Sequence, residues 1–200
     1  QIDILVTPVV TILVGIVFAS LVAAPIGTAA NSVGQAIMWA TELQPLLMGI
    51  LVSVLVGIAL TLPISSAAIC SVLGLTGLAG GAAVAGCCAQ MVGFAVMSFR
   101  ENKWGGLLSQ GIGTSMLQVP NIIKNPCIWL APTLASAITG PLAVCVFDRK
   151  MYGAAINSGM GTCGLLGPIG IILGWYGDVG YPAAVTAFDW IGLILICFIL

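Results

Sequence analysis

The chain has 200 residues, of which 60 % are hydrophobic and only 6 % charged, and its formal net charge at pH 7 is −1. A soluble domain carries about 25 % charged residues, so this composition excludes an ordinary water-soluble globule. The absence of excess positive charge gives no reason to expect a nucleic-acid partner. We therefore expect a protein whose main solvent is the lipid bilayer.

Long apolar runs support this expectation. A helix crosses a bilayer with about 20 apolar residues, and its backbone groups are satisfied internally. The runs do not alternate polar and apolar residues, as membrane β-strands would. We expect an all-α polytopic membrane protein, with 1–200 forming one transmembrane domain that is a fragment of a longer chain. The runs are 4–24, 46–62, 82–99, 128–147 and 191–200.

Basic residues give a predicted orientation. Arg100 and Lys103 lie in one short polar loop, and Arg149 and Lys150 lie in another. The positive-inside rule places both loops in the cytoplasm. The remaining basic residue, Lys124, is then expected at an outer turn between them.

An internal repeat relates 99–120 to 147–168. Each copy joins a charged loop and an aromatic residue to a Gly-x-Gly-Thr segment followed by a proline. Because both copies start from loops assigned to the cytoplasm, we expect them to run parallel. The bends are expected at Gly111, Gly113, Gly159 and Gly161.

Glycine costs about 1 kcal/mol and proline about 3 kcal/mol in a helix interior, so these segments are poor uniform helices. Transporters build solute sites from broken helices at membrane depth. We therefore expect broken or re-entrant segments that line a central site. The alternative is close helix packing through glycine, which is common in membranes.

Polar side chains within apolar surroundings are candidate functional groups. Lys124, set between two Asn residues and two prolines, can pair with an acid or with an anionic solute, or be a solvated lysine in a loop. Glu42 precedes a long apolar run and is either a site acid or a helix-capping group. Gln90 either faces a site or joins two helices. The expected solute-binding residues are Glu42, Gln44, Gln90, Thr114, Gln118, Asn121, Lys124, Asn125 and Thr162.

The sequence shows no catalytic, metal-binding or cofactor-binding constellation. Histidine is absent, and the seven cysteines have no metal-ligand spacing. The GMGTCG stretch at 159–164 fits a dinucleotide-binding pattern, but it follows an apolar span and not a β-strand. An enzyme is the least favoured class, and we expect no metal and no cofactor.

Several stretches together resemble the EIIC-like membrane subunits of the bacterial phosphotransferase system, within the PfoR-like branch. The resemblance implies a homodimeric transporter in the bacterial inner membrane that moves a small polar solute, a sugar or related carbohydrate. It also implies a cytoplasmic IIB-like partner, which would phosphorylate the sugar. The stretches are TELQP at 41–45, AQMVGF at 89–94, SFREN at 98–102, QGIGTSMLQVPNIIKNP at 110–126 and GMGT at 159–162.

The resemblance implies a glutamate in the sugar site, and Glu42 is the nearest match. Such sites often use a histidine, which this chain lacks. The alternative is a membrane sensor or regulator that signals to a cytoplasmic partner through the two basic loops.

Overall fold

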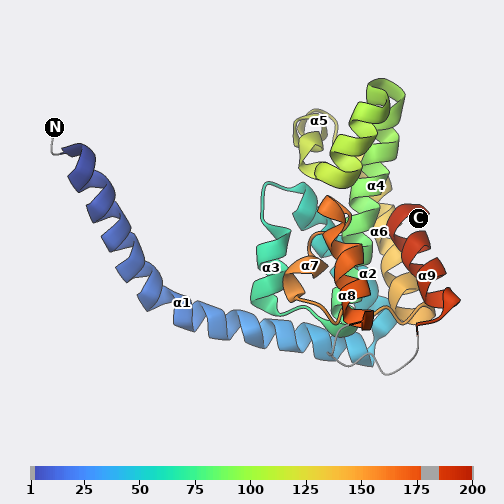
Figure 1. Ribbon diagram of the computed structural model, residues 1–200, viewed down its shortest axis with the longest axis horizontal. Helices are drawn as coiled ribbons and strands as arrows, with labels where there is room; N and C mark the ends of the chain where they lie inside the picture. Colours follow the sequence, from blue (N-terminus) through green and yellow to red (C-terminus); the bar gives the residue numbers. More distant parts are fainter. Residues whose placement is uncertain (1–2, 177–184, 200) are drawn as a thin grey trace.

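The computed structural model describes residues 3–176 and 185–199, which form helices and turns without a β-strand (Figure 1). Two of the described helical segments are long and apolar enough to cross a membrane, Gly77–Gly113 and Pro126–Val146. The expected all-α membrane fold is confirmed.

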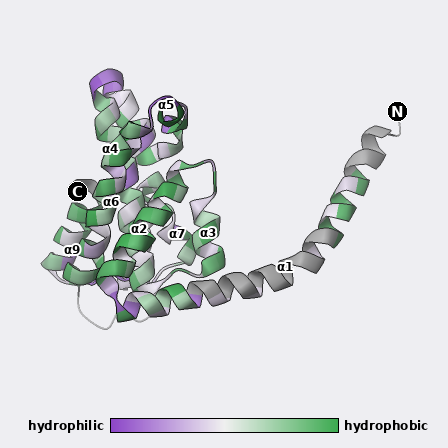
Figure 2. Ribbon diagram, turned by 180° about the vertical axis from the view of Figure 1, so that it is seen from behind, coloured by the Kyte–Doolittle hydropathy of each residue, from purple (hydrophilic) through white to green (hydrophobic). Residues whose placement is uncertain are grey.

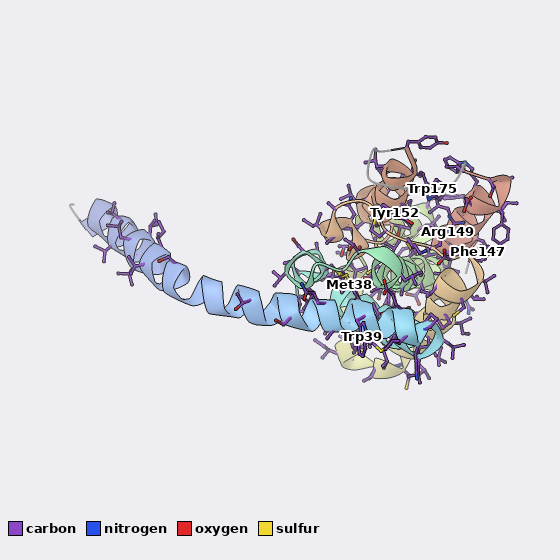
Figure 3. All side chains as sticks on the ribbon, turned by 90° about the horizontal axis from the view of Figure 1, so that it is seen from below. Met38, Trp39, Phe147, Arg149, Tyr152 and Trp175 are labelled. Atoms are coloured by element: carbon purple, nitrogen blue, oxygen red, sulfur yellow. The ribbon has the colours of Figure 1, made fainter. Side chains whose placement is uncertain are left out.

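The first half of the described chain contains four α-helices. Figure 1 shows α1 leading away from the bundle that the other helices form. The last turns of α1 contact the bundle, because Ile37 and Met38 pack against its buried core. Met38 is labelled in Figure 3. The helices are α1 (Asp3–Leu43), α2 (Pro45–Thr61), α3 (Ser66–Leu73) and α4 (Gly77–Leu108).

The second half alternates short α-helices with 3₁₀ and π segments. The α-helices are α5 (Val119–Lys124), α6 (Leu130–Pro141), α7 (Ala155–Ser158), α8 (Leu166–Tyr176) and α9 (Ala187–Ile194). The other segments are Ser109–Gly113, Ser115–Gln118, Pro126–Trp129, Leu142–Val146, Cys163–Leu165 and Leu195–Ile199.

Helix α4 is the axis of the bundle and packs on α2 and α6 through small residues. A Cβ on Gly86 would overlap the Ser53 carbonyl of α2. The Ser53 hydroxyl donates to the Ser136 carbonyl of α6, and the Ser136 hydroxyl donates to the Gly86 carbonyl. Small residues let the backbones approach closely enough for these hydrogen bonds. Close packing through glycine is therefore found at this interface.

The first repeat copy forms a re-entrant hairpin. α4 bends sharply at Lys103, where φ is 51° and ψ is −140°. The chain then returns alongside α4, because Gly106 packs on Ser98 and a Cβ on Gly111 would lie 3.4 Å from the Ala95 Cβ. Figure 2 shows hydrophilic residues at this bend and mostly hydrophobic helices below it.

The second copy forms a similar re-entrant segment at the opposite end of α4. Its first residues lie beside the start of α4, since the backbones of Gly77 and Met151 exchange two hydrogen bonds of 2.8 and 2.9 Å. The chain then runs through α7 to Gly161, which packs on Cys87 in the middle of α4. Helix α8 leads back, with Gly174 against Tyr152.

The two copies are therefore inverted, and the expected parallel orientation is wrong. Copy one starts at the Lys103 end of α4 and copy two at the Gly77 end. Their broken segments meet between these ends, where Ser109–Gly113 contacts Cys163–Leu165. The expectation of broken, re-entrant Gly-rich segments holds, and only their relative direction differs.

The predicted placement of both basic loops on one side is wrong for the same reason. Gly77 and Lys103 are about 40 Å apart at 1.5 Å per helical residue. Arg149 packs on Gly81 near one end, whereas Arg100 and Lys103 lie at the other. The predicted orientation placed Lys124 at an outer turn, but residues 105–123 turn back half way along α4, and this reverses the side of every later segment. Lys124 consequently lies on the Arg100 side.

Candidate functional site

A polar cluster lies around Gln90, midway along the straight part of α4. The Gln90 side chain is fully buried, and its Nε2 donates to Thr133 Oγ1 of α6 at 3.3 Å. Its Oε1 accepts from Thr61 Oγ1, the last residue of α2, at 3.4 Å. Thr61 Oγ1 also lies 3.1 Å from Ser115 Oγ, just beyond the first Gly-x-Gly-Thr segment. Three helices and the tip of the first hairpin thus meet at one amide.

The second Gly-x-Gly-Thr segment reaches the same level of α4. Gly161 has φ of +53°, and a Cβ there would lie 2.7 Å from the Cys87 backbone. Glycine is therefore required both for the left-handed conformation and for the close approach. The approach places the buried Thr162 hydroxyl 3.5 Å from the Met91 sulfur, next to Gln90 in the chain.

The first segment is broken by a change of helix type. Ser109–Gly113 is a π-helix, a form that is frequent at functional sites. It ends at Thr114, whose backbone is extended and whose Oγ1 accepts from the Met116 N–H at 3.2 Å. The Thr114 hydroxyl therefore caps the next turn, and the conformational break directs Ser115 toward Gln90.

Two adjoining cavities lie between this cluster and the bend of α4. Their volumes are about 320 and 420 Å³, and both are lined by the amides of Asn102, Gln118 and Asn121. We call them together the amide cavity. The first is also lined by Phe94, Met97, Ser98, Glu101 and Ile128, and the second by Gly105, Gly106, Ser109, Gln110 and Leu117.

Two buried polar atoms of the amide cavity have no hydrogen-bond partner in the structure. They are Ser98 Oγ and Gln110 Oε1, on side chains that are only 6 % and 4 % exposed. Buried polar groups are normally hydrogen-bonded, and an unsatisfied one costs about 1–3 kcal/mol. Both atoms are covered by protein, so a ligand in the cavity would reach them only after a side-chain movement.

Two of the lining amides are hydrogen-bonded to each other. Asn121 Nδ2 donates to Gln118 Oε1 at 2.8 Å. This contact leaves the Gln118 Nε2 donor and the Asn121 Oδ1 acceptor for a ligand. The cavity therefore offers both donors and acceptors, which is what a hydroxylated solute requires.

The expected site residues separate into two groups. Gln118 and Asn121 line the amide cavity, and Gln90, Thr114 and Thr162 lie at or beside the cluster below it. Gly111, Gly113, Gly159 and Gly161 lie in the broken segments, as expected.

Four expected residues lie elsewhere. Glu42 and Gln44 are exposed at the junction of α1 and α2, and the charge of Glu42 acts on Lys150 at the Gly77 end of α4. Lys124 and Asn125 are exposed at the turn after α5, where Asn125 Oδ1 accepts from the Cys127 N–H at 3.2 Å. None of the four lines the amide cavity.

Sequence reasoning missed several residues of the site. Glu101 and Asn102 lie in the polar loop of Arg100 and Lys103. They line a cavity only because the chain after Lys103 turns back along α4. Gln110 gave one usable signal, since it immediately precedes the first Gly-x-Gly-Thr segment. The missed residues are Thr61, Ser98, Glu101, Asn102, Gln110, Ser115 and Thr133.

The opposite end of the bundle is closed by a buried ion pair. Arg149, 3 % exposed, lies 3.2 Å from the Asp189 carboxylate of α9. Its guanidinium also stacks over the rings of Phe147 and Trp175, at 5.9 and 5.2 Å from their centroids (Figure 3). Next to it, the Asp148 carboxylate 3.0 Å from Lys150 Nζ raises the pKa of that lysine.

An all-helical membrane protein in which two broken segments meet beside a polar cavity has the architecture of a membrane transport subunit. The chain belongs to the phosphotransferase-system EIIC family, whose model matches residues 1–200. It is thus an integral membrane subunit of a phosphotransferase-system transporter, as its sequence resemblance indicated. The PfoR-like branch stays a prediction. No curated protein and no solved structure matches the chain.

Proposed function

We propose that this EIIC subunit moves a small polar solute, a sugar or related carbohydrate, through the amide cavity and past Gln90. The observation that carries the proposal is the position of that cavity. It reaches Phe94, one helical turn from Gln90 on α4, and the two re-entrant segments contact each other through Ser109–Gly113 and Cys163–Leu165. A solute in the cavity would therefore lie above the point where the path is closed.

The two ends of the bundle differ in a way that fits alternating access. The Glu101 end contains the amide cavity, whereas the Arg149 end is closed by an ion pair and aromatic rings. Rigid movement of one repeat against the other around a central site is how many transporters exchange such states. In this proposal the structure is the state open toward Glu101, and Gln90 contacts the solute during its passage.

The setting of the subunit is also part of the proposal. We place it as a multi-pass protein in a bacterial inner membrane, working as a homodimer with a cytoplasmic IIB-like partner. The family supports this setting, because a phosphotransferase-system membrane subunit passes its solute to a phosphorylating component. A purely sensory role would require ligand binding without solute flux, and no feature of the described residues favours it.

Binding can be tested by thermal stabilisation of the detergent-solubilised protein with a panel of hexoses and pentoses. A ligand that binds only the folded state raises the melting temperature with concentration. We expect Gln118→Leu to remove the stabilisation by the sugar that binds. Gln35→Leu, an exposed amide on α1 away from the cavity, is the matched control and should keep it.

Flux of the binding sugar into proteoliposomes tests the transport step. Uptake of the radiolabelled sugar that depends on the protein supports transport. Stabilisation by a sugar that is never taken up, alone or with the phosphorylating components, would contradict transport and support the sensor.

A further inference from the structure

The side chains that line the amide cavity carry negative charge only. Among its lining residues Glu101 is the single ionisable side chain. Arg100, Lys103 and Lys124 lie nearby in the chain, but all three are exposed and none lines the cavity. Within the described residues, no basic group lies within 4.0 Å of the Glu101 carboxylate. Glu101 is itself exposed, and its carboxylate is the single charge that lines the cavity.

Several hydrogen-bonding groups of the cavity are acceptors. Gln110 Oε1, Asn121 Oδ1 and the Glu101 carboxylate are acceptors that need donors from a ligand. A hydroxyl group can donate to them, whereas a phosphate dianion has only acceptor oxygens.

We infer that Glu101 makes the amide cavity selective for uncharged, hydroxyl-bearing solutes and excludes anions, including the phosphorylated form of the same solute. The inference rests on the proposed function for the identity of the solute, but the charge selectivity belongs to the cavity itself. Glu101 is a specificity-determining residue here, and the amides of Gln118 and Asn121 supply hydrogen bonds to the neutral ligand.

One consequence concerns the direction of transport. A solute that leaves as a phosphate ester carries a negative charge, which the Glu101 carboxylate would repel. It would therefore not re-enter the cavity from which the unphosphorylated solute came. Selectivity against anions would thus keep the phosphorylated solute from competing with the neutral one.

Charge selectivity can be measured without knowing the solute. Gln118→Cys places a thiol in the cavity wall, in a protein whose more accessible cysteines, Cys127, Cys145 and Cys163, are replaced by serine. The thiol is reacted with two methanethiosulfonates of similar size, one carrying trimethylammonium and one carrying sulfonate. Each rate is divided by the rate with a small free thiol in solution, which removes intrinsic reactivity.

We expect the corrected rate of the cationic reagent to exceed that of the anionic reagent at least fivefold. Glu101→Gln should reduce this ratio to about one. Asp148→Asn removes a negative charge at the opposite end of α4, where Asp148 is 66 % exposed, and should leave the ratio unchanged. A cationic-to-anionic rate ratio near one in the parent protein would overturn the inference. So would a ratio that is unchanged by Glu101→Gln.

A second measurement uses glucose and glucose 6-phosphate as a neutral and an anionic probe that share the same sugar ring. In the parent protein, glucose 6-phosphate should bind at least tenfold more weakly than glucose by thermal stabilisation, and Glu101→Gln should narrow the gap. Equal binding of both probes to the parent protein would contradict anion exclusion. If proteoliposomes take up no sugar but the cationic reagent still reacts faster than the anionic one, the transport proposal is overturned and the inference about charge selectivity stands.

Discussion

Gly86 sets the distance between α2 and α4. A Cβ at this position would overlap the Ser53 carbonyl, which is backbone and cannot rotate away. We expect Gly86→Ala to lower the free energy of unfolding by about 1–3 kcal/mol, the usual cost of overpacking. Gly105→Ala is the control on the same helix, because nothing lies within 4 Å of its Cβ. Thermal unfolding in detergent should show a lower melting temperature for Gly86→Ala only.

Gln90 is the residue at which a structural and a functional role can be separated. Without Gln90, the Thr61 hydroxyl still has the Gly57 carbonyl as an acceptor at 3.4 Å, and the Thr133 hydroxyl still donates to the Trp129 carbonyl at 2.8 Å. Hydrogen bonds between membrane helices are worth about 0.6 kcal/mol on average. We therefore expect Gln90→Leu to change the melting temperature little and to reduce flux at least tenfold. A large loss of stability with full specific flux would assign Gln90 to helix packing alone.

The second re-entrant element is anchored at its base by Arg149. Because this cation is buried, removing its Asp189 partner leaves an uncompensated charge, which costs about 3–5 kcal/mol. The neighbouring Lys150–Asp148 pair is largely exposed, and such pairs contribute about 0–1 kcal/mol. Chemical denaturation should thus show strong destabilisation for Asp189→Asn and little for Asp148→Asn. Similar effects of both changes would mean that the Arg149 pair is effectively solvated.

The helices that cross the bilayer were predictable from hydrophobicity, because a span in contact with lipid needs apolar residues along its whole length. The predicted runs 46–62 and 128–147 agree closely with α2 and with the described span Pro126–Val146. The re-entrant elements were recognised only as broken helices. Whether such a segment crosses or turns back depends on contacts such as Gly161 on Cys87, which link residues far apart in the sequence.

The candidate site was partly predictable for related reasons. Gln90 and Gln118 stood out because an amide in an apolar run needs a partner or a ligand. Glu101 and Ser98 did not, since they become part of a cavity only when 104–113 folds back along α4. Glu42 attracted attention as an acid beside an apolar run, but the structure places it at the opposite end of the bundle, near Lys150.

At the scale of the whole molecule, the account depends on the inverted arrangement of the two repeat copies. If the copies enter from opposite faces, their Gly-x-Gly-Thr segments meet at mid-depth beside Gln90 and can gate one path from both sides. If they enter from the same face, the amide cavity has no closing partner opposite it. The arrangement therefore decides whether the proposed path exists.

The most direct test is the sidedness of the two basic loops in the membrane. Arg100→Cys and Lys150→Cys, each in a protein without other reactive cysteines, are labelled in intact cells with a membrane-impermeant maleimide, before and after permeabilisation. The inverted arrangement predicts that one of the two positions reacts in intact cells and the other only after permeabilisation. The same behaviour at both positions would place them on one face and contradict the account.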